Sequence, residues 1–74
     1  MVTVKIVDED SGRPAKGVRV ALGFDGFFRG VTRDEWTDSN GEAHFDAEPG
    51  RGRVFVNGRT AYQGHLAGRI VVYV

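Results

Sequence analysis

Short runs of alternating apolar and polar residues cover most of this chain, and most of them end at glycine, proline, asparagine or aspartate. The first run, for example, places Val2, Val4 and Ile6 on one side of the backbone. A period of two predicts β-strands with one buried face, and no longer stretch follows the helical period of 3.6 residues. The predicted strands lie at about residues 2–8, 18–24, 31–37, 42–47, 54–56, 59–66 and 69–74.

Turn residues separate these strands. Asn40-Gly41, inside the stretch 36–45, predicts a strand–turn–strand hairpin, because asparagine and glycine accept the positive φ angles of a tight turn. Asn57-Gly58 predicts a second hairpin for the same reason. Residues 24–30 are predicted to form a hairpin loop, and Glu48-Pro49-Gly50 a break between strands.

About seven short strands without a helix predict an all-β fold, which we expect to be a small antiparallel β-sandwich. The 74 residues suit a single domain, 1–74, with a thin core, because a chain of this length buries only about 60% of its unfolded surface. The absence of cysteine excludes disulfides and cysteine-ligated metal sites. No apolar run approaches the roughly 20 residues of a membrane span.

Three segments resemble those of transthyretin-like β-sandwich domains. Residues 6–20 (IVDEDSGRPAKGVRV) resemble the V-x-D-x-x-G-x-P-x-x-G-V-x-V opening of that group, and residues 37–45 (TDSNGEAHF) resemble its T-D-x-x-G-x-x-x-F hairpin. Pro49-Gly50 followed by residues 53–56 is similar to the next strand. The group includes carboxypeptidase regulatory-like domains, collagen-adhesin repeats, and transthyretin with the hydroxyisourate hydrolases. The resemblance implies a transthyretin-like sandwich, but this fold supports unrelated functions.

The functional residues of two branches are missing. Where the hydroxyisourate hydrolases resemble this chain, they carry a histidine at the position of Lys5 and an arginine at that of Glu42, and they end in Tyr-Arg-Gly-Ser instead of Val71–Val74. We therefore expect no enzymatic activity, and a hydrolase is only a weak alternative. Collagen-adhesin repeats cross-link a first-strand lysine to a last-strand asparagine. The last strand here has no asparagine or aspartate, so we do not expect that bond.

Few residues suggest catalysis or metal binding. His44 and His65 have no cysteine or paired-acid motif beside them, and we expect both to be exposed strand residues. The acids of residues 8–10 could approach Asp38 and Asn40, but no complete calcium loop is present. We therefore predict no catalytic residue, no metal site and no cofactor.

The net charge is zero but unevenly distributed. Residues 1–50 hold all ten acids, whereas residues 51–74 hold no acid and four arginines: Arg51, Arg53, Arg59 and Arg69. This basic C-terminal quarter suggests binding to nucleic acid or to an acidic partner as an alternative function. We favour charge complementarity within the fold, since nucleic-acid-binding domains are usually basic overall.

Apolar surface is in excess of what a thin core can bury. A protein partner or a second copy of the chain would explain the excess, because exposed apolar patches and edge strands mark interaction surfaces. We therefore predict a non-catalytic binding or assembly module that acts through an edge strand and exposed aromatic residues. The candidate partner-binding residues are Phe27, Phe28, Trp36, Phe55, Tyr62, Val71 and Tyr73.

Overall fold

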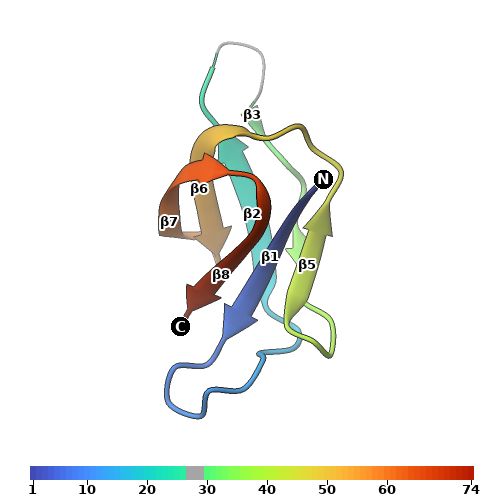
Figure 1. The fold of residues 1–74 in the computed structure, drawn as a ribbon, viewed down its shortest axis with the longest axis vertical. Helices are drawn as coiled ribbons and strands as arrows, with labels where there is room; N and C mark the ends of the chain where they lie inside the picture. Colours follow the sequence, from blue (N-terminus) through green and yellow to red (C-terminus); the bar gives the residue numbers. More distant parts are fainter. Residues whose placement is uncertain (27–29) are drawn as a thin grey trace.

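The computed structural model describes residues 1–26 and 30–74, and it consists of two packed β-sheets (Figure 1). In the first, sheet A, the strand order is β5-β1-β8. In the second, sheet B, β2 pairs with β6, which pairs with β7, and the short strands β3 and β4 both pair with β2. The strands are β1 (Val2–Val7), β2 (Arg19–Phe24), β3 (Gly30–Val31), β4 (Glu35–Trp36), β5 (Glu42–Phe45), β6 (Gly50–Val56), β7 (Arg59–Leu66) and β8 (Gly68–Tyr73).

The predicted all-β sandwich is confirmed, with some differences in the strands. The strand expected at 31–37 is two short pieces. Thr32 still donates its backbone N–H to the carbonyl of Leu22 on β2, but its side-chain hydroxyl, and not its carbonyl, accepts the N–H of Leu22, and regular pairing resumes only at Glu35. Strand β6 already starts at Gly50, where a break was predicted, whereas β7 spans the predicted residues 59–66. Pairing is antiparallel except between β1 and β8, which run parallel.

The predicted hairpin over residues 36–45 is wrong in its pairing, although its turn is correct. The backbone N–H of Gly41 bonds to the carbonyl of Asp38 at 2.9 Å, and Gly41 has a φ of 75°. However, β4 pairs with β2 in sheet B, whereas β5 pairs with β1 in sheet A. The turn therefore connects the two sheets. The hairpin at Asn57-Gly58 is confirmed, and both residues have positive φ angles, as a type I′ turn requires.

Buried Thr37 fixes this crossing. Its side-chain hydroxyl donates a hydrogen bond to the carbonyl of Ala15 at 2.6 Å and accepts one from the backbone N–H of Val18 at 2.9 Å. Among the described residues it is the buried polar side chain, with 4% of its surface exposed. These bonds hold the segment before β2 against the residue that follows β4. Thr37 is therefore the joint at which the chain passes from sheet B to sheet A.

The core lies between the sheets and consists of the inward-facing residues, which alternate with outward-facing residues along the strands. Its fully buried centre is aliphatic, with Val2, Val4, Ile6, Val20, Leu22, Val54 and Leu66 at 0% exposure. Phe24 and Phe45 are the core aromatics among the described residues. The outward residues of the same strands form the two outer faces, where the candidate sites lie. None of the described residues belongs to a helix long and apolar enough to cross a bilayer.

Candidate functional site

The predicted partner-binding residues do not form one surface. Val71 and Tyr73 lie on the outer face of sheet A, exposed to 43% and 64%. Trp36 and Phe55 lie on β4 and β6 of sheet B. Tyr62 is 38% exposed and pairs with Val54 of β6. Phe27 and Phe28 lie outside the described residues.

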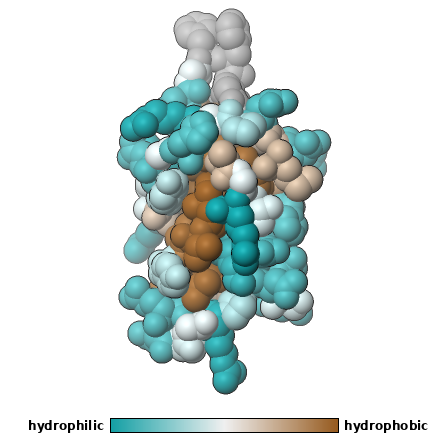
Figure 2. All heavy atoms as spheres, viewed as in Figure 1, coloured by the Kyte–Doolittle hydropathy of each residue, from teal (hydrophilic) through white to brown (hydrophobic). Residues whose placement is uncertain are grey.

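The outer face of sheet A carries a hollow of about 430 Å³ beside the edge strand β8. A strip of hydrophobic residues runs along this face over β8 and β1, bordered by hydrophilic side chains (Figure 2). The alternation of β1 and the parallel register with β8 bring the lining residues together, since Lys5 lies opposite Val71 and Val7 opposite Tyr73. The lining residues are Lys5, Val7, Gly12, Pro14, Arg69, Val71 and Tyr73.

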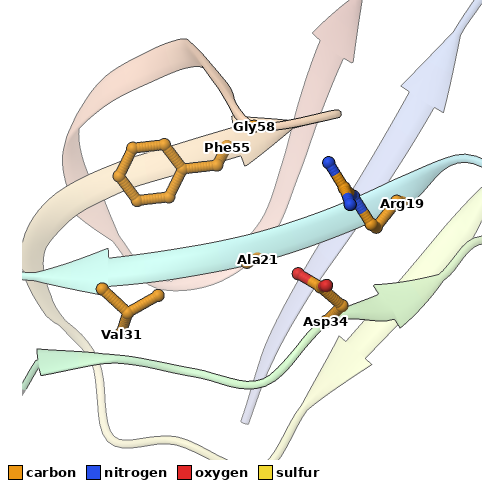
Figure 3. A pocket seen from close by; sticks show the side chains of 6 residues that line it. All are labelled: Arg19, Ala21, Val31, Asp34, Phe55 and Gly58. Carbon is orange, nitrogen blue, oxygen red and sulfur yellow. The ribbon is translucent and has the colours of Figure 1, made fainter.

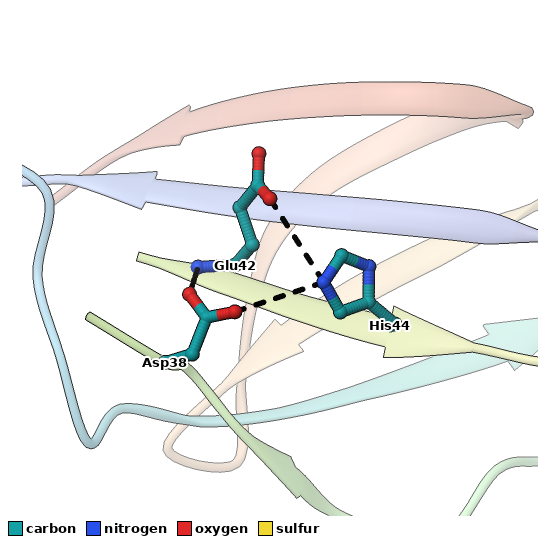
Figure 4. A group of neighbouring side chains, drawn as sticks. All are labelled: Asp38, Glu42 and His44. Atoms are coloured by element: carbon teal, nitrogen blue, oxygen red, sulfur yellow. Dashed lines mark hydrogen bonds and ion pairs between the residues drawn. The ribbon is translucent and has the colours of Figure 1, made fainter. Parts of the chain in front are cut away.

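Next to this hollow, three side chains converge at the turn that leads into β5 (Figure 4). His44 Nε2 lies 3.7 Å from Asp38 Oδ2 and 3.9 Å from Glu42 Oε1. The other ring nitrogen of His44, Nδ1, forms a hydrogen bond of 2.9 Å with the hydroxyl of Thr3 on β1. Thr3 thereby fixes the orientation of the imidazole ring.

Hydrogen bonds hold the carboxylate of Asp38, and an ion pair holds that of Glu42. Asp38 Oδ1 accepts bonds from the backbone N–H groups of Asn40 and Glu42, at 2.9 and 3.0 Å. The bond from Glu42 is the largest cause that lowers the pKa of Asp38 below its ordinary value of 3.8, and the Asn40 bond and His44 add to it. The second oxygen of Glu42 pairs with Arg69 Nε at 3.1 Å. Arg69 thus connects the cluster to the hollow.

This arrangement provides two kinds of chemistry. An imidazole with a fixed ring and two adjacent carboxylates can transfer a proton at Nε2. Asp38, Glu42 and His44 can also each offer one ligand atom, and these atoms lie within 4.8 Å of one another. Carboxylate and imidazole groups are ligands for zinc. The prediction that the chain has no metal site is not tested and stays a prediction. Asp8, Glu9 and Asp10 join no such group among the described residues.

Sequence reasoning missed Thr3 and Arg69 as members of this site. Alternation within one strand suffices to place Glu42 and His44 on the same face of β5. Thr3 and Arg69 come from other strands, and only the register places Thr3 opposite both His44 and Arg69. The strand pairing is not evident from the sequence alone.

The outer face of sheet B differs in character. A smaller hollow of about 190 Å³ lies between Val31 and the ring of Phe55, with Arg19 and Asp34 at its other end (Figure 3). Ala21 lies in its floor. Gly23 supports the Phe55 ring, since a Cβ on that glycine would lie only 2.7 Å from Phe55 Cε2.

Comparison with known proteins gives one informative result. No protein-family model matches the chain, and no curated protein matches it. A solved structure of Klebsiella pneumoniae 5-hydroxyisourate hydrolase superposes with a TM-score of 0.60 over 97% of this chain and 84% of that chain, at 19% sequence identity.

This match corrects one prediction and confirms another. The expectation that the chain is not an enzyme is contradicted, because the solved protein that it resembles over nearly its full length is itself an enzyme. Missing hydrolase residues at Lys5, Glu42 and Val71–Val74 are thus insufficient to exclude catalysis. The predicted architecture is confirmed: the chain has an all-β, transthyretin-like sandwich fold.

Proposed function

We propose that the chain is a binding module that assembles with a second copy of itself through the edge of β8. The observation that supports this most directly is the position of β8, which is an edge strand of sheet A and carries exposed Val71 and Tyr73. An edge strand with apolar side chains and unpaired backbone groups is a template for another strand.

The backbone N–H and C=O groups of β8 point alternately towards β1 and away from it. Val74 donates a hydrogen bond to the carbonyl of Val7 and accepts one from the N–H of Glu9, each at 2.9 Å. In a parallel ladder alternate residues point the same way, so Ile70 and Val72 share this direction towards β1. The N–H and C=O groups of Arg69, Val71 and Tyr73 therefore point away from β1.

A two-fold axis near Val71 would satisfy these groups. Two antiparallel copies of β8 would pair Val71 with itself and Arg69 with Tyr73 of the second copy, extending the three strands of sheet A to a continuous six-stranded sheet. The two hollows beside β8 would then lie next to each other on one face of that sheet.

A lysine at position 71 tests this model, because a charged edge residue opposes strand pairing. We expect light scattering across a concentration series to give a dimer for the parent chain and a monomer for Val71→Lys. Val31→Lys is the matched control, since Val31 is 68% exposed but lies on sheet B, and it should remain dimeric. A parent chain that is monomeric at millimolar concentration would contradict the proposal.

Hydrolysis on the same face is a second candidate, favoured by the position of His44 beside the hollow and by the enzyme with a similar fold. His44 Nε2 would take a proton from water as the water oxygen attacks the substrate carbonyl, while Nδ1–H is donated to Thr3. The two carboxylates would stabilise the resulting imidazolium, which would return the proton to the leaving group as its bond to the carbonyl carbon breaks. A substrate with an acidic or carbonyl group would lie against Lys5.

The test is turnover of 5-hydroxyisourate, the substrate in the name of the similar structure. We expect His44→Ala to reduce turnover at least 100-fold, in the range of general acid–base catalysis. His65→Ala is the matched control, because His65 is an exposed histidine on sheet B. Turnover that is undetectable, or equal in both variants, would exclude this second candidate.

A further inference from the structure

The outer face of sheet B gathers positive charge from two distant parts of the chain. Arg51 and Arg53 lie on β6, and Gly52 between them points inward. Arg19 lies on β2, which precedes β6 by four strands in the sequence but is its neighbour in the sheet. All three arginines are exposed. We call these three residues, together with Phe55 and Trp36, the arginine face.

Strand pairing separates this face from Arg69, which belongs to the same C-terminal quarter. Arg53 lies between Gly23 of β2 and Gln63 of β7, and Arg51 lies opposite His65. Arg69 instead lies on sheet A and pairs with Glu42. The arginines of the C-terminal quarter therefore do not form one surface. Arg69 lies on sheet A, whereas Arg19, from the N-terminal half of the chain, lies on the same face as Arg51 and Arg53.

Among the described residues, the arginines of this face form no direct ion pair. Within residues 1–26 and 30–74, no acid forms an ion pair within 4 Å of Arg19, Arg51 or Arg53. Two acids lie beside these arginines without forming an ion pair. Asp25 follows the last residue of β2, with its N–H bonded to the carbonyl of Arg51, and Asp34 lies at the end of the smaller hollow. The charge pattern is thus complementary to an anionic partner.

Aromatic residues accompany this charge. The ring of Phe55 is half-buried and lies against Gly23, with one side on the hollow lined by Ala21 and Val31 (Figure 3). Trp36, the only tryptophan, is 60% exposed and lies opposite Arg19 in the β2–β4 ladder. Unpaired nucleobases stack on such rings, while arginines contact the phosphates between them.

We propose that the arginine face binds single-stranded nucleic acid. Arg51, Arg53 and Arg19 contact phosphates, and bases stack on Phe55 and Trp36. Single strands are favoured over duplexes because a paired base cannot present its face to the Phe55 ring. Acidic polypeptides are the competing partner class, but they gain nothing from an aromatic platform. The proposal does not depend on assembly through β8.

Trp36 supplies the readout, because a base stacked near it should quench its fluorescence. The titrant is a twelve-nucleotide oligo-uridine or oligo-thymidine at low salt. Three phosphate contacts predict a slope of about −2 in log K against log salt, since each contact on a single strand contributes about −0.7. Arg51→Ala and Arg53→Ala should each reduce that slope by about 0.7.

Matched variants separate the face from general charge. Arg33→Ala removes an exposed arginine that lies off this face, beside Glu35 and Asp46, and should leave the slope unchanged. Phe55→Leu keeps the charge but removes a stacking ring, and should weaken binding about 5- to 100-fold. Because the arginines are exposed, their variants should fold even if Phe55→Leu does not.

Three results would overturn the proposal. The first is no binding at 20 mM salt. The second is an equal loss of affinity on Arg69→Ala, which would assign binding to the C-terminal quarter as a whole. The third is binding of poly-glutamate or of duplex DNA as tight as that of the single strand, with no effect of Phe55→Leu, because the face would then recognise negative charge alone.

Discussion

The outer faces of the two sheets show how one alternation rule produces two different surfaces. On sheet A, Arg69 is paired with Glu42, and the imidazole of His44 lies 3.7 Å from Asp38, beside an apolar strip on β8. On sheet B, Arg51 and Arg53 carry no ion pair among the described residues, and the aromatic Phe55 lies on glycine. Their inner faces, by contrast, consist almost entirely of the same aliphatic side chains.

The difference indicates where function is encoded. Inward positions must fill a common core at high density, so they are restricted to valine, leucine, isoleucine and a few aromatics. Outward positions have no such restriction, and each face can therefore carry its own charges and hollows. We propose self-association and proton-transfer chemistry for sheet A, and anion recognition for sheet B. The following predictions test this division.

The largest effect is expected where both faces depend on the shared core. Ile6→Ala removes a fully buried side chain of β1 and should lower the free energy of unfolding by about 2–5 kcal/mol. The total stability of a domain of this size is only about 4–11 kcal/mol. Trp36 fluorescence reports on sheet B and far-ultraviolet circular dichroism on both sheets. Their unfolding curves should coincide, and separate transitions would show that the sheets are independent.

A smaller effect is expected at the joint between the sheets. Thr37→Val keeps the shape of the side chain but leaves the N–H of Val18 and the carbonyl of Ala15 without their partner. Buried polar groups without partners are costly, so we expect a loss of about 2 kcal/mol in urea denaturation. Thr60→Val, on exposed β7, is the control and should change stability by less than about 0.5 kcal/mol. Equal losses in both variants would contradict this role for Thr37.

Gly23→Ala should affect only sheet B. The added methyl group would displace the Phe55 ring, at a cost of about 1 kcal/mol, because a flexible side chain can move aside. Gly12→Ala is the control: it places alanine at a φ of 73°, with nothing within 4 Å of its Cβ, and should cost about as much. Only Gly23→Ala should shift the NMR signals of Phe55 and weaken oligonucleotide binding. Unchanged Phe55 signals would refute the contact.

The smallest effect is a pH dependence confined to sheet A. The folded pKa of Asp38 is lowered, so its contribution to stability is present above pH 3.8 and is lost as the pH falls through the folded pKa. Asp38→Asn should therefore flatten the decline of the urea midpoint between about pH 5 and 2. An NMR titration of the Asp38 carboxyl measures the pKa directly. A midpoint at or above 3.8 would contradict the hydrogen bonds described here.

Much of the fold was predictable because it is encoded locally. Alternation identified β1, β2, β5 and β8, and the Asn57-Gly58 turn followed from residues that tolerate positive φ. The segment 36–45 shows the limit of local reasoning. Its turn chemistry was correct, but the partners of Trp36 and Phe45 are β2 and β1, each distant in sequence. A turn sequence determines its own backbone angles and not the sheet that each strand joins.

The sequence by itself therefore determined the strands, their buried sides and the sandwich architecture, since a period of two and turn chemistry act over only a few residues. The tertiary structure alone decided the strand order and register, because pairing depends on contacts between distant segments. The register places Thr3 beside His44, brings Arg69 within ion-pair distance of Glu42, and places Arg19 on the same face as Arg51 and Arg53. Each candidate site contains side chains from separate strands, so each exists only once the sheets have formed.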